Sequence, residues 1–374
     1  MMKINNKLKV MYLTSTLNRD NGMGNFSFQL ITALQKTINA KVMVSMKEPA
    51  VSIDTHPILP DPMKSSAVDL IAGSVRLSKQ AKQCDIIHCL DEHYLALTGL
   101  TAFLAKKPYV IHSIGTYSAL LLRKTVLKAL YKFIFKRAHR VICISRFTRD
   151  VLMKHITLHN TEVIFPGVSE EYFVQSEDIV PVGKKENIIL LSVGAVKGRK
   201  GYDISLRAFA KVKKKINSIK YYITGDIQSG QYYELLKQII KEQGIENDVA
   251  FLGKVNRTEL ITLYQDCTIF VLTPRYINDN FEGFGLVYLE AGASAKPVVA
   301  SASGGVPDAV VDRETGILVP ENDCDATAAA LEELINNEEL RHTLGTNGYH
   351  RARKFTWDTS ASQIMRIYET CQPS

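Results

Sequence analysis

Two glutamates and a glycine-bearing loop form the segment best suited to chemistry. Glu282 and Glu290 lie eight residues apart in the stretch NFEGFGLVYLEAGASAKPVVAS, residues 280–301. Carboxylates accept hydrogen bonds from paired hydroxyl groups, such as those of a sugar or a ribose. Gly283 and Gly285 let the backbone approach a ligand closely, and the short helix predicted after them would point unpaired N–H groups at a diphosphate. The segment therefore predicts a site for a phosphorylated, hydroxyl-rich ligand.

The same residue types also have a plain structural interpretation, because a loop glutamate can be solvated and a helix glutamate can form a salt bridge. The flanking glycines and the apolar helix favour ligand binding over that alternative. A second glycine pair, Gly22 and Gly24, lies between a predicted strand and a predicted helix. This pair lacks the third glycine and the downstream acidic residue of a dinucleotide fingerprint, which disfavours a nicotinamide oxidoreductase. A tight turn is the plain structural interpretation of this pair.

No metal site is visible in the sequence. The chain has no paired aspartate motif, no histidine cluster and no Cys-x-x-Cys pair. Its cysteines are scattered singly, so we expect small buried apolar residues in a reducing compartment, the cytosol. We therefore expect no metal and no cofactor. The six cysteines are Cys84, Cys89, Cys143, Cys267, Cys324 and Cys371.

Short apolar and β-branched runs alternate with helical patterns along both halves of the chain. The strands expected in the first half cover residues 8–14, 41–45, 85–89, 109–113, 141–145 and 161–165, with helices over 26–37, 68–83 and 94–106. Those expected in the second half cover residues 188–193, 220–224, 249–252, 269–272, 297–300 and 316–319, with helices over 202–215, 232–243, 257–265, 285–295 and 325–336. Strands that alternate with helices predict parallel sheets with right-handed crossovers.

A length of 374 residues suits two domains. The polar stretch SEDIVPVGKKEN, residues 176–187, has the composition of a linker. We therefore expect an α/β protein in which residues 1–175 and 188–355 form two Rossmann-like, doubly wound parallel-sheet domains that face each other across a cleft. Ligands should bind at the carboxyl ends of the strands.

The charge of the chain is unevenly distributed. Residues 1–170 contain 23 lysines and arginines against 11 aspartates and glutamates, whereas residues 171–374 contain 23 against 27. A basic half can attract nucleic acid, an acidic glycan or an anionic membrane, but no aromatic-rich basic motif is visible, so we expect no nucleic acid. Lysines and arginines break the most apolar long segment, residues 119–144, and no signal peptide is visible. We expect a cytoplasmic protein, at most peripheral on the inner face of the cell membrane.

A lysine stripe in the first half could contact such a membrane. Lys124, Lys128, Lys132 and Lys136 recur every four residues, which places them on one face of a single predicted helix with an apolar side. The stripe could be a solvated surface, or it could dock the protein to anionic lipid.

The pattern FEGFGLVYLEA resembles the acidic signature, Glu, seven residues, Glu, of the family 4 retaining glycosyltransferases (glycosyl transferases group 1), which have the GT-B fold. LSVGAVKGRKGYD resembles the phosphate loop that opens that family's second domain. YITGD, FLGKV, SGGVPDAV and ETGILVP follow in the family's order, and FTWDTSASQIMRIYE resembles its terminal helix, here within residues 356–374, which crosses back to the first domain. The resemblance extends over nearly the whole chain.

This resemblance implies a role for each matching residue. Glu290 would bind the ribose of a nucleotide-sugar donor, and Glu282 would contact the transferred sugar. Lys200 would neutralise the diphosphate with help from Arg199 or Lys197, stabilising the negative charge that grows as the glycosidic bond breaks. The other donor-binding positions are Gly283, Phe284, Gly285, Leu286, Gly194, Lys254, Val255, Gly22 and Gly24.

The chain departs from the family pattern at three positions. Ala195 stands where the family commonly has Arg after the glycine of its phosphate loop. In PYVIHSIGTYSA the family's usual His-Gly reads Ile114-Gly, and the nearest histidine is His112. A two-residue offset keeps the same face of a strand, so His112 could still contact the donor sugar, or it could be structural. Asp308 replaces a common Glu.

These observations together favour one function and leave two alternatives. The expected protein is a retaining, metal-independent glycosyltransferase that moves a hexose-type sugar from a UDP- or GDP-sugar to a glycan or lipid-linked acceptor. Its expected place is cell-surface polysaccharide or glycolipid biosynthesis. The alternatives are a non-catalytic, degenerate nucleotide-sugar-binding protein and a sugar-nucleotide epimerase of the same fold.

Overall fold

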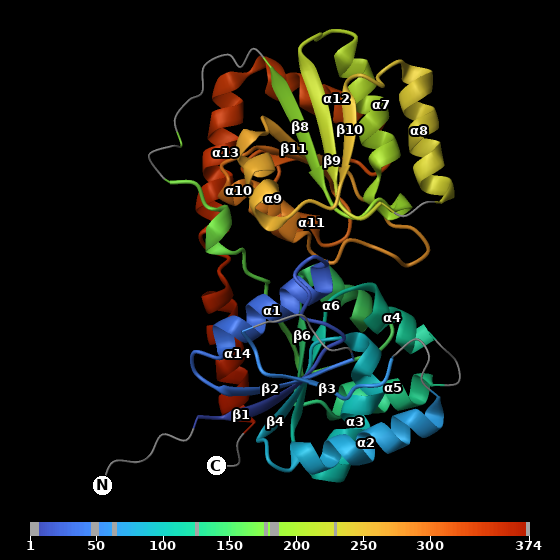
Figure 1. The fold of residues 1–374 in the computed structure, drawn as a ribbon, viewed down its shortest axis with the longest axis vertical. Helices are drawn as coiled ribbons and strands as arrows, with labels where there is room; N and C mark the ends of the chain where they lie inside the picture. The colour runs from blue at the N-terminus through green and yellow to red at the C-terminus, as the bar shows by residue number, and fades with distance from the viewer. Residues whose placement is uncertain are drawn as a thin grey trace. The chain divides into compact units, whose positions relative to one another are not determined.

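The structure is a computed structural model that describes residues 7–45, 52–61, 66–123, 127–175, 179, 187–227 and 230–371. The chain forms two compact units (Figure 1). The first comprises Met1–Gly167 and Trp357–Ser374, and the second Val168–Thr356. The sequence places this division later, with a linker over residues 176–187, of which only 179 and 187 lie within the described residues.

The first unit contains a parallel sheet with the strand order β3-β2-β1-β4-β5-β6-β7 among the described residues. Its strands are β1 (Lys9–Leu13), β2 (Asn39–Val44), β3 (Thr55–Pro57), β4 (Ile86–Cys89), β5 (Tyr109–Ser113), β6 (Arg140–Cys143) and β7 (Thr161–Val163). The strand pattern of the sequence does not predict β3, because this edge strand is only three residues long and contains a proline. The order reverses between β1 and β4, which is where a doubly wound sheet binds ligands at its carboxyl ends.

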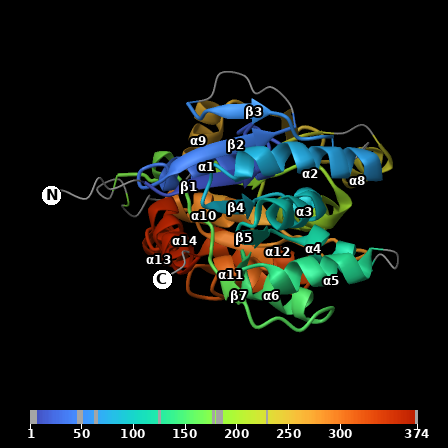
Figure 2. The same cartoon turned by 90° about the horizontal axis from the view of Figure 1, so that it is seen from below.

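Helices cover both faces of this sheet (Figure 2). The helices of the first unit are α1 (Gly22–Leu34), α2 (Ala67–Ala81), η1 (Glu92–Tyr94), α3 (Leu95–Ala105), α4 (Thr116–Arg123), α5 (Lys128–Arg137), α6 (Arg146–Met153) and α14 (Trp357–Thr370). α2, α3 and α5 pack on one face through a core that includes Leu77, Leu95 and Ile134. α1 and α14 contact each other, and Tyr368 of α14 bonds Tyr12 of β1 at 3.0 Å. The terminal helix therefore completes the first unit.

The lysine stripe does not lie on one continuous helix. α4 ends at Arg123 and α5 begins at Lys128, so Lys128, Lys132 and Lys136 share α5. Lys124 lies outside the described residues. The prediction of one helix carrying all four lysines is therefore wrong.

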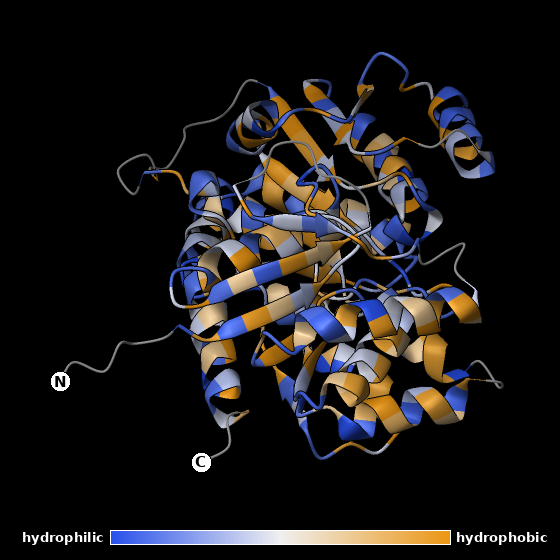
Figure 3. Ribbon diagram, turned by 60° about the horizontal axis from the view of Figure 1, so that its bottom comes forward, coloured by the Kyte–Doolittle hydropathy of each residue, from blue (hydrophilic) through white to orange (hydrophobic). Residues whose placement is uncertain are grey.

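The second unit repeats the plan with the strand order β10-β9-β8-β11-β12-β13, again parallel. Its strands are β8 (Ile188–Val193), β9 (Ile219–Thr224), β10 (Val249–Gly253), β11 (Ile269–Leu272), β12 (Val298–Ser301) and β13 (Gly316–Val319). They are largely hydrophobic, as strands buried on both faces must be (Figure 3). The predicted doubly wound α/β architecture is thus confirmed for both units.

The helices of the second unit follow local signals in the sequence. They are η2 (Glu170–Tyr172), η4 (Gly198–Lys200), α7 (Tyr202–Lys213), α8 (Gln231–Gln243), α9 (Arg257–Asp266), α10 (Leu286–Ala293), α11 (Val306–Ala309), α12 (Cys324–Asn336) and α13 (Glu338–Ala352). Asn256 and Glu259 form a capping box that starts α9, and Gly244 ends α8 with φ of 65°. Among the described residues, no helix is both long and apolar enough to span a membrane.

Candidate functional site

Three charged side chains meet at the carboxyl edge of the second unit's sheet. Lys200 Nζ lies 2.6 Å and Arg199 Nη1 2.9 Å from Glu282 Oε2. Both cations come from the loop and 3₁₀ turn after β8, and Glu282 lies in the loop before α10. The cluster carries two positive charges against one negative charge, so its net charge favours an anionic ligand.

Burial makes this cluster electrostatically strong. Lys200 is only 8% exposed, and burial lowers its pKa despite the neighbouring Glu282. Burial would raise the pKa of Glu282, but the charges of Lys200 and Arg199 outweigh that effect and hold it at about 2. Glu282 is therefore ionised at neutral pH and pairs with both cations.

A second ion pair holds the backbone of the cationic loop. Arg275 Nη1 and Nη2 contact the two Asp203 oxygens at 3.0 and 2.9 Å. The same arginine donates from Nε to the Gly198 carbonyl and from its backbone N–H to the Arg199 carbonyl. Asp203 lies in the first turn of α7. The pair thus fixes the loop from both sides, and the sequence analysis missed it because its members lie 72 residues apart.

Glycines bring the loop that carries Glu282 against its neighbour. A Cβ at Gly305 would lie 2.0 Å from the Gly283 carbonyl oxygen, and one at Gly304 would lie 2.4 Å from that of Glu282. Gly285 has φ of 88° and caps α10. Only glycine permits this contact and this turn. The backbone therefore presents Gly283, Gly285 and the start of α10 at the same sheet edge as the cationic cluster.

Glu290 occupies a different, buried polar cluster. It is 8% exposed and accepts a hydrogen bond from Tyr264 Oη at 2.8 Å. Burial raises its pKa, against the opposing effects of Arg257 and the tyrosine hydroxyls of Tyr264 and Tyr172. Arg257 lies over the Tyr172 ring at 4.3 Å. The two glutamates thus have separate partners. Tyr264 and Arg257 escaped the sequence analysis, because only the fold brings α9 to α10.

The other predicted donor-binding residues lie around the same edge. Gly194 and the exposed Lys197 follow β8, and the half-buried Val255 follows β10. Lys254 is mostly exposed and pairs with Asp226 at 3.2 Å, so it lies outside the Glu282 cluster. Two further positions flank Gly285: Phe284 is buried, and Leu286 is the first residue of α10.

Gly22 and Gly24 occupy the first turn of α1 in the first unit. The Asn21 side chain accepts the Gly24 N–H at 2.7 Å and caps this helix. A Cβ at Gly24 would lie 2.1 Å from the Asn18 carbonyl, whereas one at Gly22 would meet nothing within 4 Å. Gly24 is therefore required by the turn, and the backbone of Gly22 is open to close approach.

His112 is enclosed by the core of the first unit. It is 2% exposed and its ring stacks on that of His88, with Nδ1 3.0 Å from His88 Nε2. Phe26 covers it edge-on, and burial lowers its pKa to about 3, so the ring is neutral. Its predicted contact with the donor sugar stays a prediction that this geometry does not favour.

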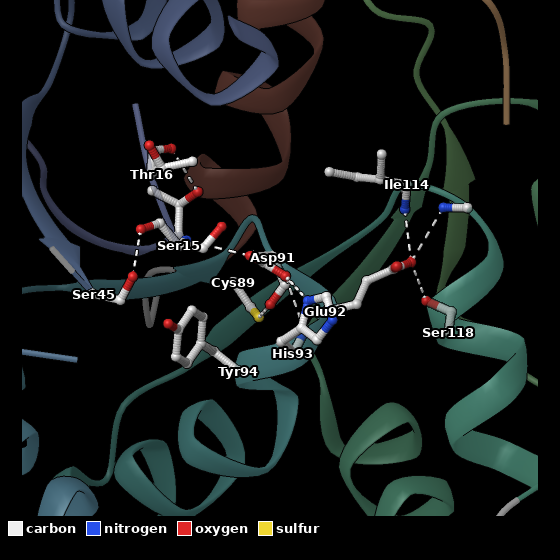
Figure 4. A network of polar contacts seen from close by, with 12 residues as sticks. Ser15, Thr16, Ser45, Cys89, Asp91, Glu92, His93, Tyr94, Ile114 and Ser118 are labelled. Atoms are coloured by element: carbon white, nitrogen blue, oxygen red, sulfur yellow. Dashed lines mark hydrogen bonds and ion pairs between the residues drawn. The ribbon is translucent and has the colours of Figure 1, made fainter. Parts of the chain in front are cut away.

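A polar network that the sequence analysis missed follows β4 in the first unit (Figure 4). Asp91 accepts hydrogen bonds from His93 Nδ1 at 2.7 Å and from the Ser15 N–H at 3.3 Å. Glu92 accepts from the Ile114 N–H at 2.8 Å and from Ser118 Oγ at 2.5 Å. The available signal in the sequence is the run DEHY, which begins at Asp91, two residues after the end of the buried strand β4 at Cys89. Among the described residues, no group of three or more histidines, cysteines, aspartates or glutamates could hold a metal ion.

Comparison with known families matches both units. Residues 174–351 match the family model for glycosyl transferases group 1, and residues 20–172 match that for glycosyltransferase family 4. The chain belongs to the group 1 glycosyltransferases. The resemblance expected from FEGFGLVYLEA and its companion motifs is thereby confirmed.

Individual relatives are distant in sequence. An uncharacterized glycosyltransferase of Methanocaldococcus jannaschii is 26% identical over 83% of this chain and 83% of its own length. A D-inositol 3-phosphate glycosyltransferase of Corynebacterium aurimucosum is 30% identical over 61% of this chain and 56% of its own length. The GDP-mannose-dependent alpha-(1-6)-phosphatidylinositol monomannoside mannosyltransferase of Mycolicibacterium smegmatis is 27% identical over 68% of this chain and 67% of its own length. This group 1 enzyme thus spans between about half and most of the length of these relatives.

Solved structures share the fold. Anabaena HepE in complex with UDP and glucose has a TM-score of 0.80 and 21% identity, over 97% of this chain and 100% of that one. Sucrose-phosphate synthase from Thermosynechococcus elongatus has a TM-score of 0.77 and 20% identity, over 97% of this chain and 99% of that one. With the two parallel sheets, this likeness confirms the GT-B fold.

Proposed function

We propose that this glycosyltransferase is retaining and metal-independent, and that it moves a hexose-type sugar from a UDP- or GDP-sugar to a glycan or lipid-linked acceptor. The observation that carries the proposal is the cluster that the buried Lys200 forms with the half-buried Arg199 and Glu282 beside the start of α10. A diphosphate would bind the two cations and the N–H groups of that helix end. Glu282, released from the cations, would then accept hydrogen bonds from the sugar hydroxyls.

The named relatives and neighbours support this type of donor. The mycobacterial relative is GDP-mannose-dependent, and the solved HepE structure contains UDP and glucose. The proposed donor is a sugar on UDP or GDP. The mycobacterial relative acts on a phosphatidylinositol monomannoside and others act on D-inositol 3-phosphate. These names support a hydroxyl-bearing acceptor that is a glycan or is attached to a lipid.

The proposed chemistry needs little from the protein beyond charge and position. The acceptor hydroxyl attacks the anomeric carbon from the face that the nucleotide leaves, so the new bond keeps the configuration of the old one. The departing phosphate oxygen takes the acceptor's proton. Lys200 and Arg199 stabilise the negative charge that grows on this oxygen, the role that a metal ion has in other transferases.

Metal independence is open to direct test. Release of the nucleotide from the donor in EDTA-treated buffer should equal release with Mg²⁺ or Mn²⁺ added, within a factor of two. Arg199→Ala should then be partly rescued by Mn²⁺, because the metal supplies the missing charge. Loss of activity in EDTA that Mn²⁺ restores in the wild-type protein would contradict this part of the proposal.

Stereochemistry can be tested before the acceptor is known. In buffer containing methanol, the alcohol should replace the acceptor in a slow side reaction, and NMR of the methyl glycoside gives its anomeric configuration. We expect the configuration of the donor. An inverted glycoside would overturn the retaining assignment, a donor sugar changed at another carbon would favour the epimerase, and donor binding with no turnover would favour the degenerate binding protein.

A basic and apolar surface supports a peripheral membrane role in polysaccharide or glycolipid biosynthesis. Leu130 and Phe133 of α5 are exposed beside Lys132 and Lys136, which with Lys154 line a hollow of about 280 Å³. Apolar side chains beside lysines suit the boundary between acyl chains and anionic headgroups. We propose that α5 docks on the anionic inner face of the cell membrane.

Vesicle sedimentation tests this docking. Vesicles of phosphatidylglycerol mixed with phosphatidylcholine should bind the full chain, and vesicles of pure phosphatidylcholine should not. Phe133→Ser with Lys136→Gln should reduce binding at least tenfold, whereas Lys211→Gln, an exposed lysine of the second unit, should leave it unchanged. Equal binding of both vesicle types, or no effect of the double change, would show that α5 is a solvated surface.

A further inference from the structure

Two neighbouring acids tie together the carboxyl-edge loops of the first unit (Figure 4). Asp91 and Glu92 are each only 1% exposed. Asp91 holds the loop after β1 through the Ser15 N–H, and Glu92 holds the loop after β5 through two backbone N–H groups and Ser118. These hydrogen bonds fix the backbone of the loops at the place where the strand order reverses, between β1 and β4.

His93 is more exposed than the two acids of this network. Its side chain is 26% exposed, against 2% for that of Asp91. Burial would raise the pKa of Asp91, but hydrogen bonds from His93 and Ser15 outweigh it and the pKa is lowered. An ionised carboxylate only accepts hydrogen bonds, so His93 Nδ1 must donate, and the tautomer and direction of the ring are fixed. Nε2 lies on the opposite side of the ring from this carboxylate.

An exposed tyrosine completes an aromatic pair. The ring of Tyr117 lies 4.2 Å from that of His93 at an angle of 53° and is 48% exposed. Tyr117 follows the loop that Glu92 holds, next to Ser118. Two rings from different strand connections are thus held at the edge where this sheet should bind a ligand.

We propose that His93 and Tyr117 form the acceptor subsite and bind an uncharged saccharide, with Asp91 and Glu92 as positioning residues. An aromatic face suits the C–H face of a pyranose, and the polar edge of an imidazole suits its hydroxyls. The ionised Asp91 one contact away disfavours a phosphorylated acceptor at this point. The subsite rests on the proposed function, in which the acceptor is a glycan or is attached to a lipid.

Binding can be measured directly with defined probes. In the full chain with ¹³C,¹⁵N-labelled histidine, the imidazole signal of His93 is assigned through His93→Gln. It is then followed while methyl glycosides of glucose, galactose, mannose and N-acetylglucosamine are added, together with inositol 1-phosphate. We expect at least one neutral glycoside to shift this signal saturably, and Tyr117→Ala to raise its Kd at least tenfold. Phe103→Ala, an exposed aromatic of α3, is the matched control.

Three outcomes would overturn the subsite. They are no response of His93 to any glycoside, a response that Tyr117→Ala leaves intact, and a stronger response to inositol 1-phosphate than to the neutral sugars. Donor binding, measured in the same sample by thermal shift with UDP- and GDP-sugars, separates this result from the proposed function. A donor that binds while His93 stays silent contradicts the subsite alone.

Transfer kinetics distinguish a binding role from a structural one. With the glycoside that binds as acceptor, Tyr117→Ala should raise the acceptor KM at least tenfold and leave the donor KM and the slow hydrolysis of the donor within twofold. Asp91→Asn should change the ¹⁵N signature of the His93 tautomer and raise the acceptor KM. An amide can donate as well as accept, so His93 Nδ1 is no longer required to carry the proton. An equal fall of hydrolysis and transfer in both variants would mean general damage, and would contradict the assignment.

Discussion

At the scale of single residues, Lys200 has the most to do in the proposed chemistry. Its side chain is buried and contacts Glu282. Burial lowers the pKa of Lys200, which means that removing the ammonium group from water disfavours its charged form. A structural lysine would gain little from such a position. The arrangement is explained if a bound diphosphate uses the charge.

Replacing this charge should therefore slow the reaction more than it weakens binding. Lys200→Ala should lower kcat for donor hydrolysis by about 100-fold, the size of effect seen when one group that stabilises transition-state charge is removed. The measurement is steady-state hydrolysis of the donor, with Lys211→Ala as control, since Lys211 is an exposed surface lysine that pairs with Asp325. An unchanged kcat in Lys200→Ala would remove this residue from the site.

Glu290 should affect binding of the donor instead. Its carboxylate is buried beside Tyr264 and would exchange that hydrogen bond for the ribose hydroxyls. Glu290→Ala should raise the donor KM by about 10- to 100-fold, because hydrogen bonds to a charged group contribute about 1.5–3 kcal/mol. Glu333→Ala, a half-buried glutamate paired with Arg313, should leave the donor KM unchanged. A normal donor KM in Glu290→Ala would show that Glu290 only supports the packing of α9 on α10.

At the scale of elements, the contact between two loops positions the site. Gly305 must approach the Gly283 carbonyl, and a methyl group there would lie 2.0 Å from that oxygen. Gly305→Ala should therefore displace the loop of Glu282, raise the donor KM about tenfold and lower the free energy of unfolding by about 1–3 kcal/mol. Gly230→Ala is the control, because its Cβ would meet nothing within 4 Å. Equal behaviour of the two variants would mean that the loop adapts without consequence.

The burial of Glu92, which holds the loop after β5, should make the stability of the first unit depend on pH. Burial, opposed by the hydrogen bonds from Ser118, Gly115 and Ile114, raises the pKa of Glu92 from 4.5 to about 7. Between these values the folded chain binds more protons than the unfolded chain, so the Glu92 contribution to the free energy of unfolding falls as pH rises. Glu92→Gln keeps a carbonyl acceptor and removes the titration. The free energy of unfolding of Glu92→Gln, relative to that of the wild type, should therefore rise by about 3 kcal/mol between pH 4 and pH 8.

Fluorescence can follow this unfolding selectively. The chain has a single tryptophan, Trp357, which is buried in the first unit. Urea unfolding of wild type, Glu92→Gln and the control Glu162→Gln at both pH values gives the comparison. A difference between wild type and Glu92→Gln that does not change with pH would contradict the raised pKa.

The elements themselves were largely predictable from the sequence, because buried parallel strands are continuous apolar runs and caps mark the helix ends. The errors occur where that signal is weak. β3 has three residues and a proline, and the lysine pattern continues across the break between α4 and α5. α1 begins at Gly22, four residues before the predicted start, because the Asn21 side chain caps a turn rich in glycine.

The site was predictable only where its residues are neighbours in sequence. The loop of Lys200 and the helix of Glu290 each form a compact motif. Their partners do not, because the Asp203–Arg275 pair and the contact of Tyr264 with Glu290 are made by the fold. Burial of His112 likewise depends on Phe26 and His88, which come from other elements.

At the scale of the whole molecule, the two units divide the proposed work between them. The second unit carries the cationic cluster and the buried Glu290, and the first carries the loops of Asp91 and Glu92 and the basic surface of α5. This division agrees with the charge of the chain, since residues 1–170 contain 23 basic against 11 acidic residues. This charge suits the proposed contact of the first unit with an anionic membrane, and the loops of the proposed acceptor subsite carry the buried acids Asp91 and Glu92.

In the proposed function, the second unit binds a nucleotide-sugar donor for transfer. This binding is tested most directly by thermal unfolding of the full chain with UDP-, GDP-, ADP- and dTDP-sugars, with metal-free hydrolysis measured in the same samples. At a concentration 100 times its Kd, a true donor should stabilise the fold by about 2.7 kcal/mol. We expect one nucleotide class to raise the melting temperature and to be hydrolysed slowly. In Glu290→Ala the same donor concentration should stabilise the fold by only about 0.4–1.4 kcal/mol, because the donor binds about 10- to 100-fold more weakly. No stabilisation by any donor, or full stabilisation in Glu290→Ala, would contradict donor binding at this site.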